Sequence, residues 1–108
     1  MEEDPELRRT LWFLLGGKRG GENKARIIRY VREKPGNLNQ IASGLHLQYK
    51  TIQHHARILV RSSLLVTSGE KYGTVYLLSP WLEHHIGTFD MICTKLGFVE
   101  APTVNPAS

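Results

Sequence analysis

The segment from Gln48 to Ser62 carries polar residues of the types that contact duplex DNA. Its inward face is predicted from four residues that recur at helical spacing, three of them apolar: Ile52, His55, Ala56 and Leu59. The opposite face then carries Lys50, Thr51, Gln53, His54, Arg57 and Arg61. Glutamine pairs bidentately with adenine, lysine suits the acceptors of guanine, and threonine offers a hydroxyl or a methyl group. No acid occurs between Gln48 and Ser68, so the pattern favours DNA contact over an ordinary solvated face.

A shorter helix before this segment has to position it. Ile41, Ala42 and Leu45 recur at helical spacing, and we expect Asn39 to cap this helix. Residues 46–48 then form a connection short enough for a helix-turn-helix. In that motif the N-terminal part of the second helix enters the groove, which selects as base-reading residues Lys50, Thr51, Gln53 and His54. We expect at least one of these four to touch only phosphate.

Three other residues of the predicted recognition helix have more than one interpretation. His55 lies on the apolar stripe, so we expect a satisfied histidine in the core or at its rim rather than a DNA contact. Tyr49 could stack on a sugar or anchor the helix in the core, and we favour the anchor. Arg57 lies further along the helix, so its predicted DNA contact depends on where the helix ends.

The rest of the chain predicts three more helices and a β-hairpin. Pro5 suits a first helical turn, Pro35 follows the end of a helix, and Ser79 can cap the last helix. The predicted elements are helices over Glu3–Leu15, Asn23–Lys34 and Pro80–Leu96, and strands over 64–68 and 74–78. We therefore expect a mainly α fold with a small β-hairpin, in one domain over residues 1–96. Its core would be residues 23–78, and residues 97–108 would be a flexible tail.

Further cations lie where the chain can reach a phosphate. Lys71 and Tyr72 lie at the tip of the hairpin between glycines, and Lys18 and Arg19 lie between glycines in the first loop. Arg26 lies near the start of a basic stripe on the second helix. We expect all five to contact DNA; the alternative for each is ordinary solvated surface.

The two terminal helices carry apolar stripes that need burial. The last helix repeats apolar residues at intervals of four, three, four and three, at Leu82, Ile86, Phe89, Cys93 and Leu96. The first helix adds Leu7, Leu11 and Trp12. A second copy of the chain would cover both stripes, so we expect a homodimer through these side chains. The alternative is that each helix packs on its own domain.

Composition argues against most other functions. The chain has 14 Lys+Arg against 10 Asp+Glu, a net charge of +4, which fits a polyanion partner. Cys93 is the sole cysteine and His84 and His85 are adjacent, so we expect no metal site. The sequence offers no Cys–His or Ser–His–Asp set and no phosphate loop, so we expect neither catalysis nor a cofactor. Without a long apolar stretch we expect a cytoplasmic protein and no membrane contact.

Residues 23–78 predict three helices followed directly by a two-stranded wing, the layout of winged helix-turn-helix DNA-binding domains. Three segments resemble the archaeal ArsR-type winged-helix transcription regulators: LWFLLGGKRGG (11–21), LQYKTIQHH (47–55) and YGTVYLLSP (72–80). The resemblance implies that the third helix of this unit lies in the major groove and that the wing touches backbone or minor groove. It also implies that the additional N- and C-terminal helices form a symmetric dimer.

The sequence thus predicts a homodimeric transcription regulator that binds double-stranded DNA sequence-specifically. One alternative is an architectural, chromatin-like protein that binds DNA through phosphates alone. Another is a winged-helix module that binds protein, because a fold does not determine function. The acid-free face of the recognition helix speaks against the second alternative.

Overall fold

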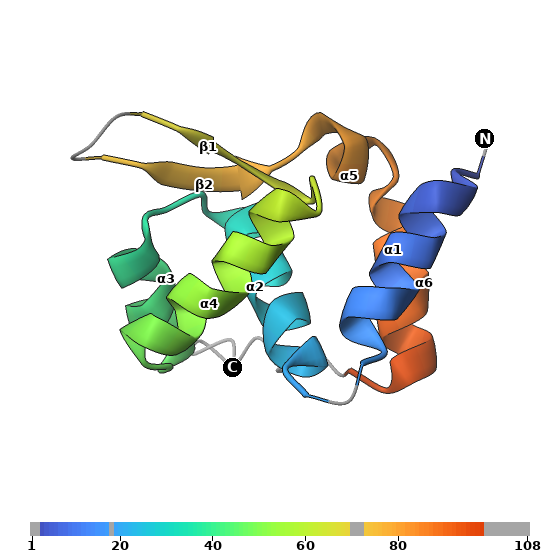
Figure 1. Cartoon of the computed structure of the whole chain (residues 1–108), viewed down its shortest axis with the longest axis horizontal. Coiled ribbons are helices and arrows are strands. Elements are labelled where there is room, and N and C mark those ends of the chain that lie inside the picture. The colour runs from blue at the N-terminus through green and yellow to red at the C-terminus, as the bar shows by residue number, and fades with distance from the viewer. Residues whose placement is uncertain (1–2, 18, 70–72, 99–108) are drawn as a thin grey trace, which may run out of the picture.

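The computed structural model describes residues 3–17, 19–69 and 73–98. In that part the elements are α1 (Pro5–Leu15), α2 (Gly21–Glu33), α3 (Leu38–Leu45), α4 (Tyr49–Arg61), β1 (Leu65–Ser68), β2 (Val75–Leu78), α5 (Pro80–His84) and α6 (Ile86–Leu96). The fold is mainly α with a two-stranded antiparallel hairpin, as the sequence predicts (Figure 1). The predicted flexible tail at 97–108 lies largely outside the described residues.

Short polar side chains determine where several helices begin. Asp4 caps α1, because its Oδ1 accepts from the Leu7 amide at 3.0 Å. α3 begins after Asn37 rather than at the predicted cap Asn39, because Asn37 and Gln40 form a reciprocal capping box. α2 begins after Gly20, whose φ of 77° no other residue type adopts as easily.

The predicted last helix is in fact two helices that meet at His85 (Figure 1). His85 leaves the helical conformation at φ −117° and ψ 33°, and Gly87 just after it is a poor helix former. The N-terminal segment also holds α5, because Trp81 Nε1 donates to Asp4 Oδ2 at 2.7 Å. This hydrogen bond is the main cause that lowers the pKa of Asp4, followed by the bond from the Leu7 amide.

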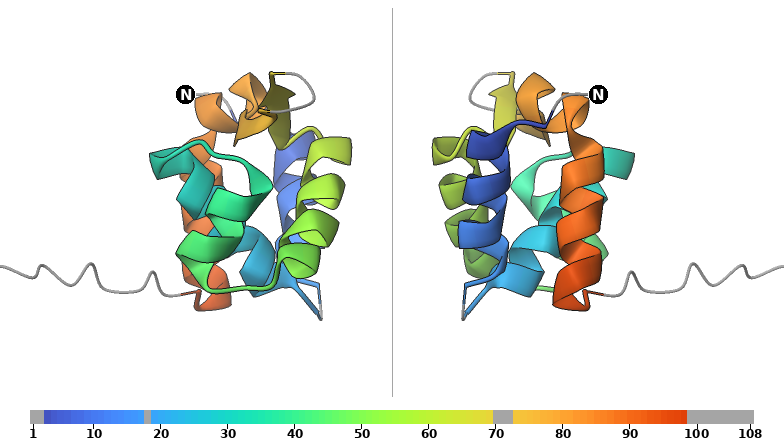
Figure 2. Two further views of the ribbon diagram at one scale, coloured as in Figure 1. Left: turned by 90° about the vertical axis from the view of Figure 1, so that its left-hand side faces the viewer. Right: turned by 90° about the vertical axis from the view of Figure 1, so that its right-hand side faces the viewer.

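One hydrophobic core holds the helices together, with α2 at its centre. α2 packs against α1, α3, α4 and β2, while α1 packs along α6. Figure 2 shows α1 and α6 side by side although they lie near opposite ends of the sequence. The largest fully buried side chains include Leu7 and Leu11 from α1, Ile52 and Leu59 from α4, and Phe89 from α6.

The hairpin continues directly from α4 and is fastened to the rest of the fold. Its antiparallel register pairs Leu65 with Leu78 and Ser68 with Val75. Leu65 is buried, and the Tyr76 amide donates to the Gly36 carbonyl at 2.8 Å. The segment after α2 therefore forms an isolated bridge with β2 and holds the hairpin beside the helices.

Candidate nucleic-acid interface

A three-residue turn joins α3 and α4, as the sequence predicts. α3 ends at His46, which takes the left-handed conformation at φ 57°. The Leu47 amide then donates to the Ala42 carbonyl at 3.0 Å. From α2, Arg26 Nη2 donates to the Leu45 carbonyl at 3.0 Å and so satisfies an acceptor at the end of α3. The turn is thus held both by its own backbone and by a side chain of α2.

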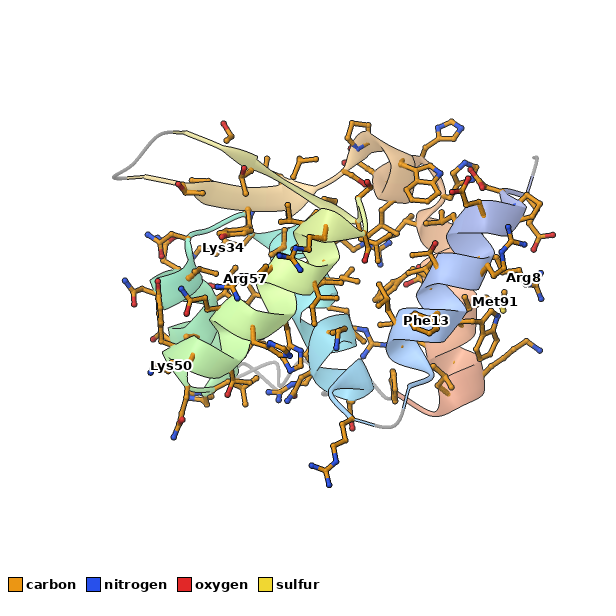
Figure 3. The ribbon with its side chains drawn as sticks, viewed as in Figure 1. Arg8, Phe13, Lys34, Lys50, Arg57 and Met91 are labelled. Atoms are coloured by element: carbon orange, nitrogen blue, oxygen red, sulfur yellow. The ribbon has the colours of Figure 1, made fainter. Side chains whose placement is uncertain are left out.

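The outward face of α4 is polar and carries no acid. Lys50, His54, Arg57 and Arg61 are exposed, and Thr51 and Gln53 are partly exposed. The inward residues Ile52, His55, Ala56 and Leu59 are buried. Figure 3 places Lys50 near the start of α4 and Arg57 further along the same helix. The orientation of this helix therefore agrees with the predicted division into an inward and an outward face.

Two tyrosines extend this polar face. Tyr49 is 43% exposed at the first position of α4, so the prediction that it anchors the helix in the core is wrong. Tyr76 of β2 was missed by the sequence reasoning. Burial raises the pKa of its phenol, Tyr49 raises it further, and Arg57 lowers it. Tyr49 and Arg57 of α4 therefore both act electrostatically on Tyr76 of the hairpin.

Solved proteins share this arrangement of helices and hairpin. HlyU from Vibrio cholerae in its reduced form superposes with a TM-score of 0.61 at 18% identity, over 82% of this chain and 90% of that one. Mb0332 from Mycobacterium bovis gives 0.63 at 11% identity, over 88% and 91%. Rv0081 from Mycobacterium tuberculosis gives 0.60 at 11% identity, over 88% and 94%. The chain has a winged-helix fold.

The likeness to these proteins is one of fold, because the sequence identities are low. The structure of Mb0332 is of a homodimeric winged helix-turn-helix DNA-binding domain from a possible ArsR-family transcriptional regulator. No protein-family model matches the sequence, and no curated protein matches it. In the winged-helix fold, α4 occupies the position called the recognition helix, and β1 with β2 forms the hairpin called the wing.

The predicted basic stripe on α2 is largely engaged within the chain. Besides its bond to Leu45, Arg26 donates to Asn23 Oδ1 at 3.3 Å. Arg29 donates to the Phe98 carbonyl at 2.8 Å, and Arg32 forms an ion pair with Asp90 at 3.1 Å. Arg26 therefore supports the turn before the recognition helix, a structural role that its predicted DNA contact did not foresee. Spacing alone could not show this, because the partners lie far away in the sequence.

The other predicted phosphate contacts are only partly visible. Arg19 is exposed in the loop between α1 and α2. Lys18, Lys71 and Tyr72 lie outside the described residues, so their predicted contacts stay predictions. The wing strands on both sides of 70–72 are described and are joined in register.

Most side chains predicted to form the dimer interface lie in the chain's own core. Leu7, Leu11, Leu82, Phe89 and Cys93 are all at most 1% exposed within a single chain. The prediction that they contact a second copy needs correction, because α1 and α6 already bury each other's stripes. The remaining members of that set are only partly buried: Trp12, Ile86 and Leu96.

The apolar side chain that α1 does present to solvent is Phe13, which is 80% exposed. Phe13 borders a groove of about 610 Å³ between α1, the C-terminal end of α4 and α5. The groove is lined by Glu6, Arg9, Thr10, Phe13, Leu14, Arg61, Ser62, Ser63 and Trp81. Helical spacing could have identified Phe13, because it lies off the stripe that Leu7 and Leu11 begin.

His55 is buried on the recognition helix, as predicted, but it is not satisfied. Its side chain is 7% exposed, and its Nδ1 has no hydrogen-bond partner among the described residues. Burial lowers its pKa, and the neighbouring Lys24 and His54 lower it further. The imidazole is therefore held in its neutral form by its surroundings.

In the part of the chain that the structure describes, no three His, Cys, Asp or Glu side chains come together in a way that could hold a metal ion. None of the described helices is both long enough and apolar enough to cross a membrane.

Proposed function

We propose that this chain is a transcription regulator that binds double-stranded DNA sequence-specifically as a homodimer. The recognition helix would lie in the major groove, and the wing would lie on the flanking backbone or minor groove. The observation that carries the proposal is the outward face of α4, which presents Lys50, His54 and Arg57 without a single acid. This face combines groups that pair with base edges and cations that pair with phosphates.

Each part of the outward face has a role in the proposal. Lys50, Thr51, Gln53 and His54 lie in the first two turns of the recognition helix, the part that reaches base edges in this kind of motif. Arg57 lies near Tyr49 and Tyr76, so it would meet the backbone where helix and wing join. The phosphate contacts further out would come from Lys18, Arg19, Lys71 and Tyr72. Because chromosomal DNA is the partner, we place the protein in the cytoplasm.

A substitution that removes directed hydrogen bonds without removing charge tests whether the protein recognises particular base pairs. Gln53→Ala should cost on the order of 1–3 kcal/mol at one base pair of each half-site, because one bidentate contact is lost there. Preference at that position should flatten, and the dependence of affinity on salt should stay nearly unchanged. The measurement is a titration of fluorescent duplexes, with a site first selected from a random pool.

Lys71→Ala is the matched control because lysine offers charge without direction. This variant should weaken binding to selected and random duplexes about equally. It should reduce the slope of log affinity against log salt by about one for each phosphate contact removed. If Gln53→Ala keeps the unmodified protein's preference for the selected site, the architectural alternative is the better reading. If no duplex is bound at all, the protein-binding alternative takes its place.

The second copy in the proposed dimer would cover Phe13. An aromatic side chain at 80% exposure beside a groove is a feature that association would bury. The Mb0332 domain, which shares the fold, is homodimeric. The groove also includes Arg61 at the end of the recognition helix, so a partner seated there would touch the element proposed to enter the DNA.

Phe13→Glu should therefore convert the dimer into a monomer, because it places a charge where apolar surface is to be buried. Loss of the second half-site should also weaken DNA binding. Light scattering coupled to gel filtration measures the mass directly. Val66→Glu is the matched control, since Val66 is an exposed apolar residue on the wing and its replacement should leave the mass unchanged. A monomeric mass for the unmodified protein at micromolar concentration would contradict the proposed dimer.

A further inference from the structure

Two basic side chains are buried next to each other where the recognition helix packs on α2. Lys24 of α2 is 6% exposed and His55 of α4 is 7% exposed. After burial, Lys24 is the largest influence that lowers the pKa of His55. Neither side chain has an acidic partner among the described residues, because the ion pairs found there join other groups. Placing a charge on a buried imidazole that has no acidic partner is costly, so His55 stands out.

The elements that pack most extensively on α4 are α2, α3 and β1. The acids of α2, Glu22 and Glu33, are exposed and are not among the charges that act on His55. α3 has the sequence LNQIASGL and β1 has the sequence LVTS, so neither contains an ionisable residue. The charges that act on His55 come from Lys24 on α2 and from His54 on α4 itself, and all of them are basic. A proton on His55 would thus meet only groups that repel it.

The imidazole also has little room to move away on its own. Gly20 packs flat against it, so closely that a methyl group on Gly20 would lie 2.4 Å from His55 Cε1. The Nδ1 atom is buried and lacks an acceptor that could take a new N–H bond. A proton on His55 would therefore place a charged N–H group at a buried position without an acceptor, which disfavours the packing of α4 on α2.

We propose that Lys24 and His55 form an acid-sensitive switch that loosens the recognition helix from α2 when His55 takes up a proton. At a pH above the ordinary range of histidine titration, neutral His55 lets α4 pack on α2. Below that range, a proton on His55 destabilises this packing. The expected effect on DNA binding rests on the function proposed above. The expected effect on folding stability does not.

The direction of the effect follows from proton binding. Burial first, and then Lys24 and His54, lower the pKa of His55 below its ordinary value of 6.5. The unfolded chain therefore binds a proton that the folded protein refuses once the pH falls below that ordinary value. The stabilisation from neutral His55 is complete above it and is lost as the pH falls towards the lowered value. In that window the folding equilibrium constant drops by up to about tenfold per pH unit for this one proton.

Urea unfolding of the full chain at about pH 7.5 and about pH 5.5, on either side of the ordinary histidine pKa, tests the switch without DNA. Between these two pH values, protonation of His55 should lower the folding equilibrium constant of the unmodified protein by up to roughly tenfold. His55→Gln, which keeps a polar side chain but cannot take up a proton, should lose clearly less. His54→Gln is the matched control, because His54 is exposed and its replacement should keep the acid loss. Equal acid losses in the unmodified protein and His55→Gln would overturn the proposal.

An NMR titration of the unmodified protein covers the case in which His55→Gln does not fold. The ring signals of His55 should begin to shift only well below the ordinary pKa, and the amide signals of α4 should shift with them. An ordinary titration of His55 with unmoved α4 amides would overturn the switch.

Duplex binding at the same two pH values then reports on DNA. Weaker duplex binding in acid by the unmodified protein, abolished in His55→Gln, would support release of the recognition helix. Tighter binding in acid by both proteins would overturn that release. If acid destabilises the protein through His55 but no duplex is bound at either pH, the proposed function fails and the switch stands.

Discussion

Replacing Phe89 with alanine should lower the free energy of unfolding by about 3–5 kcal/mol, the usual cost of removing a large aromatic side chain from a core. Phe89 is 0% exposed in a single chain and belongs to the same core as Leu7 and Leu11 of α1. Truncation would leave a cavity in the part of the core where α6 packs on α1. The cost would fall on folding of the chain itself and not on assembly.

Urea unfolding followed by circular dichroism measures this loss. Val66→Ala is the control, because Val66 is an apolar side chain on the wing that is exposed to solvent. It should change the stability of the single chain by a few tenths of a kcal/mol. A stable Phe89→Ala protein that only changes its mass would restore the interface that the sequence pattern suggested for this residue.

Gly20→Ala should destabilise the protein by about 2–4 kcal/mol, through two effects that add at one position. Gly20 has a φ of 77°, a left-handed conformation in which a Cβ is strained. The new methyl group would also lie 2.4 Å from the buried His55 ring. Because His55 belongs to the recognition helix, a displacement of its ring should also weaken duplex binding.

Gly87→Ala provides the contrast for this prediction. Gly87 lies in α6, and a methyl group there would meet no atom within 4 Å. Because alanine favours helices over glycine, this variant should gain about 0.5–1 kcal/mol. Thermal unfolding of both variants shows whether the loss of stability is specific to position 20 or follows from replacing any glycine. Equal stability of Gly20→Ala and the unmodified protein would show that the loop adapts without moving His55.

Much of the fold was predictable because its elements follow local rules. Helical spacing identifies the inward residues of α4, and the glycines around 69–73 mark the connection between the strands. The break at His85 was missed because the apolar spacing continues unchanged through it. The hydrogen bond from Trp81 to Asp4, which holds α5 beside the start of α1, joins distant residues and no local pattern reveals it.

The candidate site divides in the same way. The outward face of α4 follows from periodicity alone, so its polar residues were placed correctly. An apolar stripe, however, states only that burial is needed and does not say whether the same chain or another supplies it. Phe89 and Leu11 are buried within one chain, in which α6 packs on α1, whereas the stripe pattern did not single out the exposed Phe13. The Lys24–His55 contact was also beyond reach, since it depends on where α2 crosses α4.

The pairing of α1 with α6 has a consequence for how the chain is made. α1 leaves the ribosome long before α6, and at about 5–20 residues per second the delay amounts to several seconds. During that time Leu7, Leu11 and Leu15 lack the helix that completes their burial. A nascent chain thus exposes a row of leucines to chaperones and to neighbouring chains while the segments from α2 to the wing are already forming local contacts. Synthesis is therefore the stage at which this small protein is most open to aggregation.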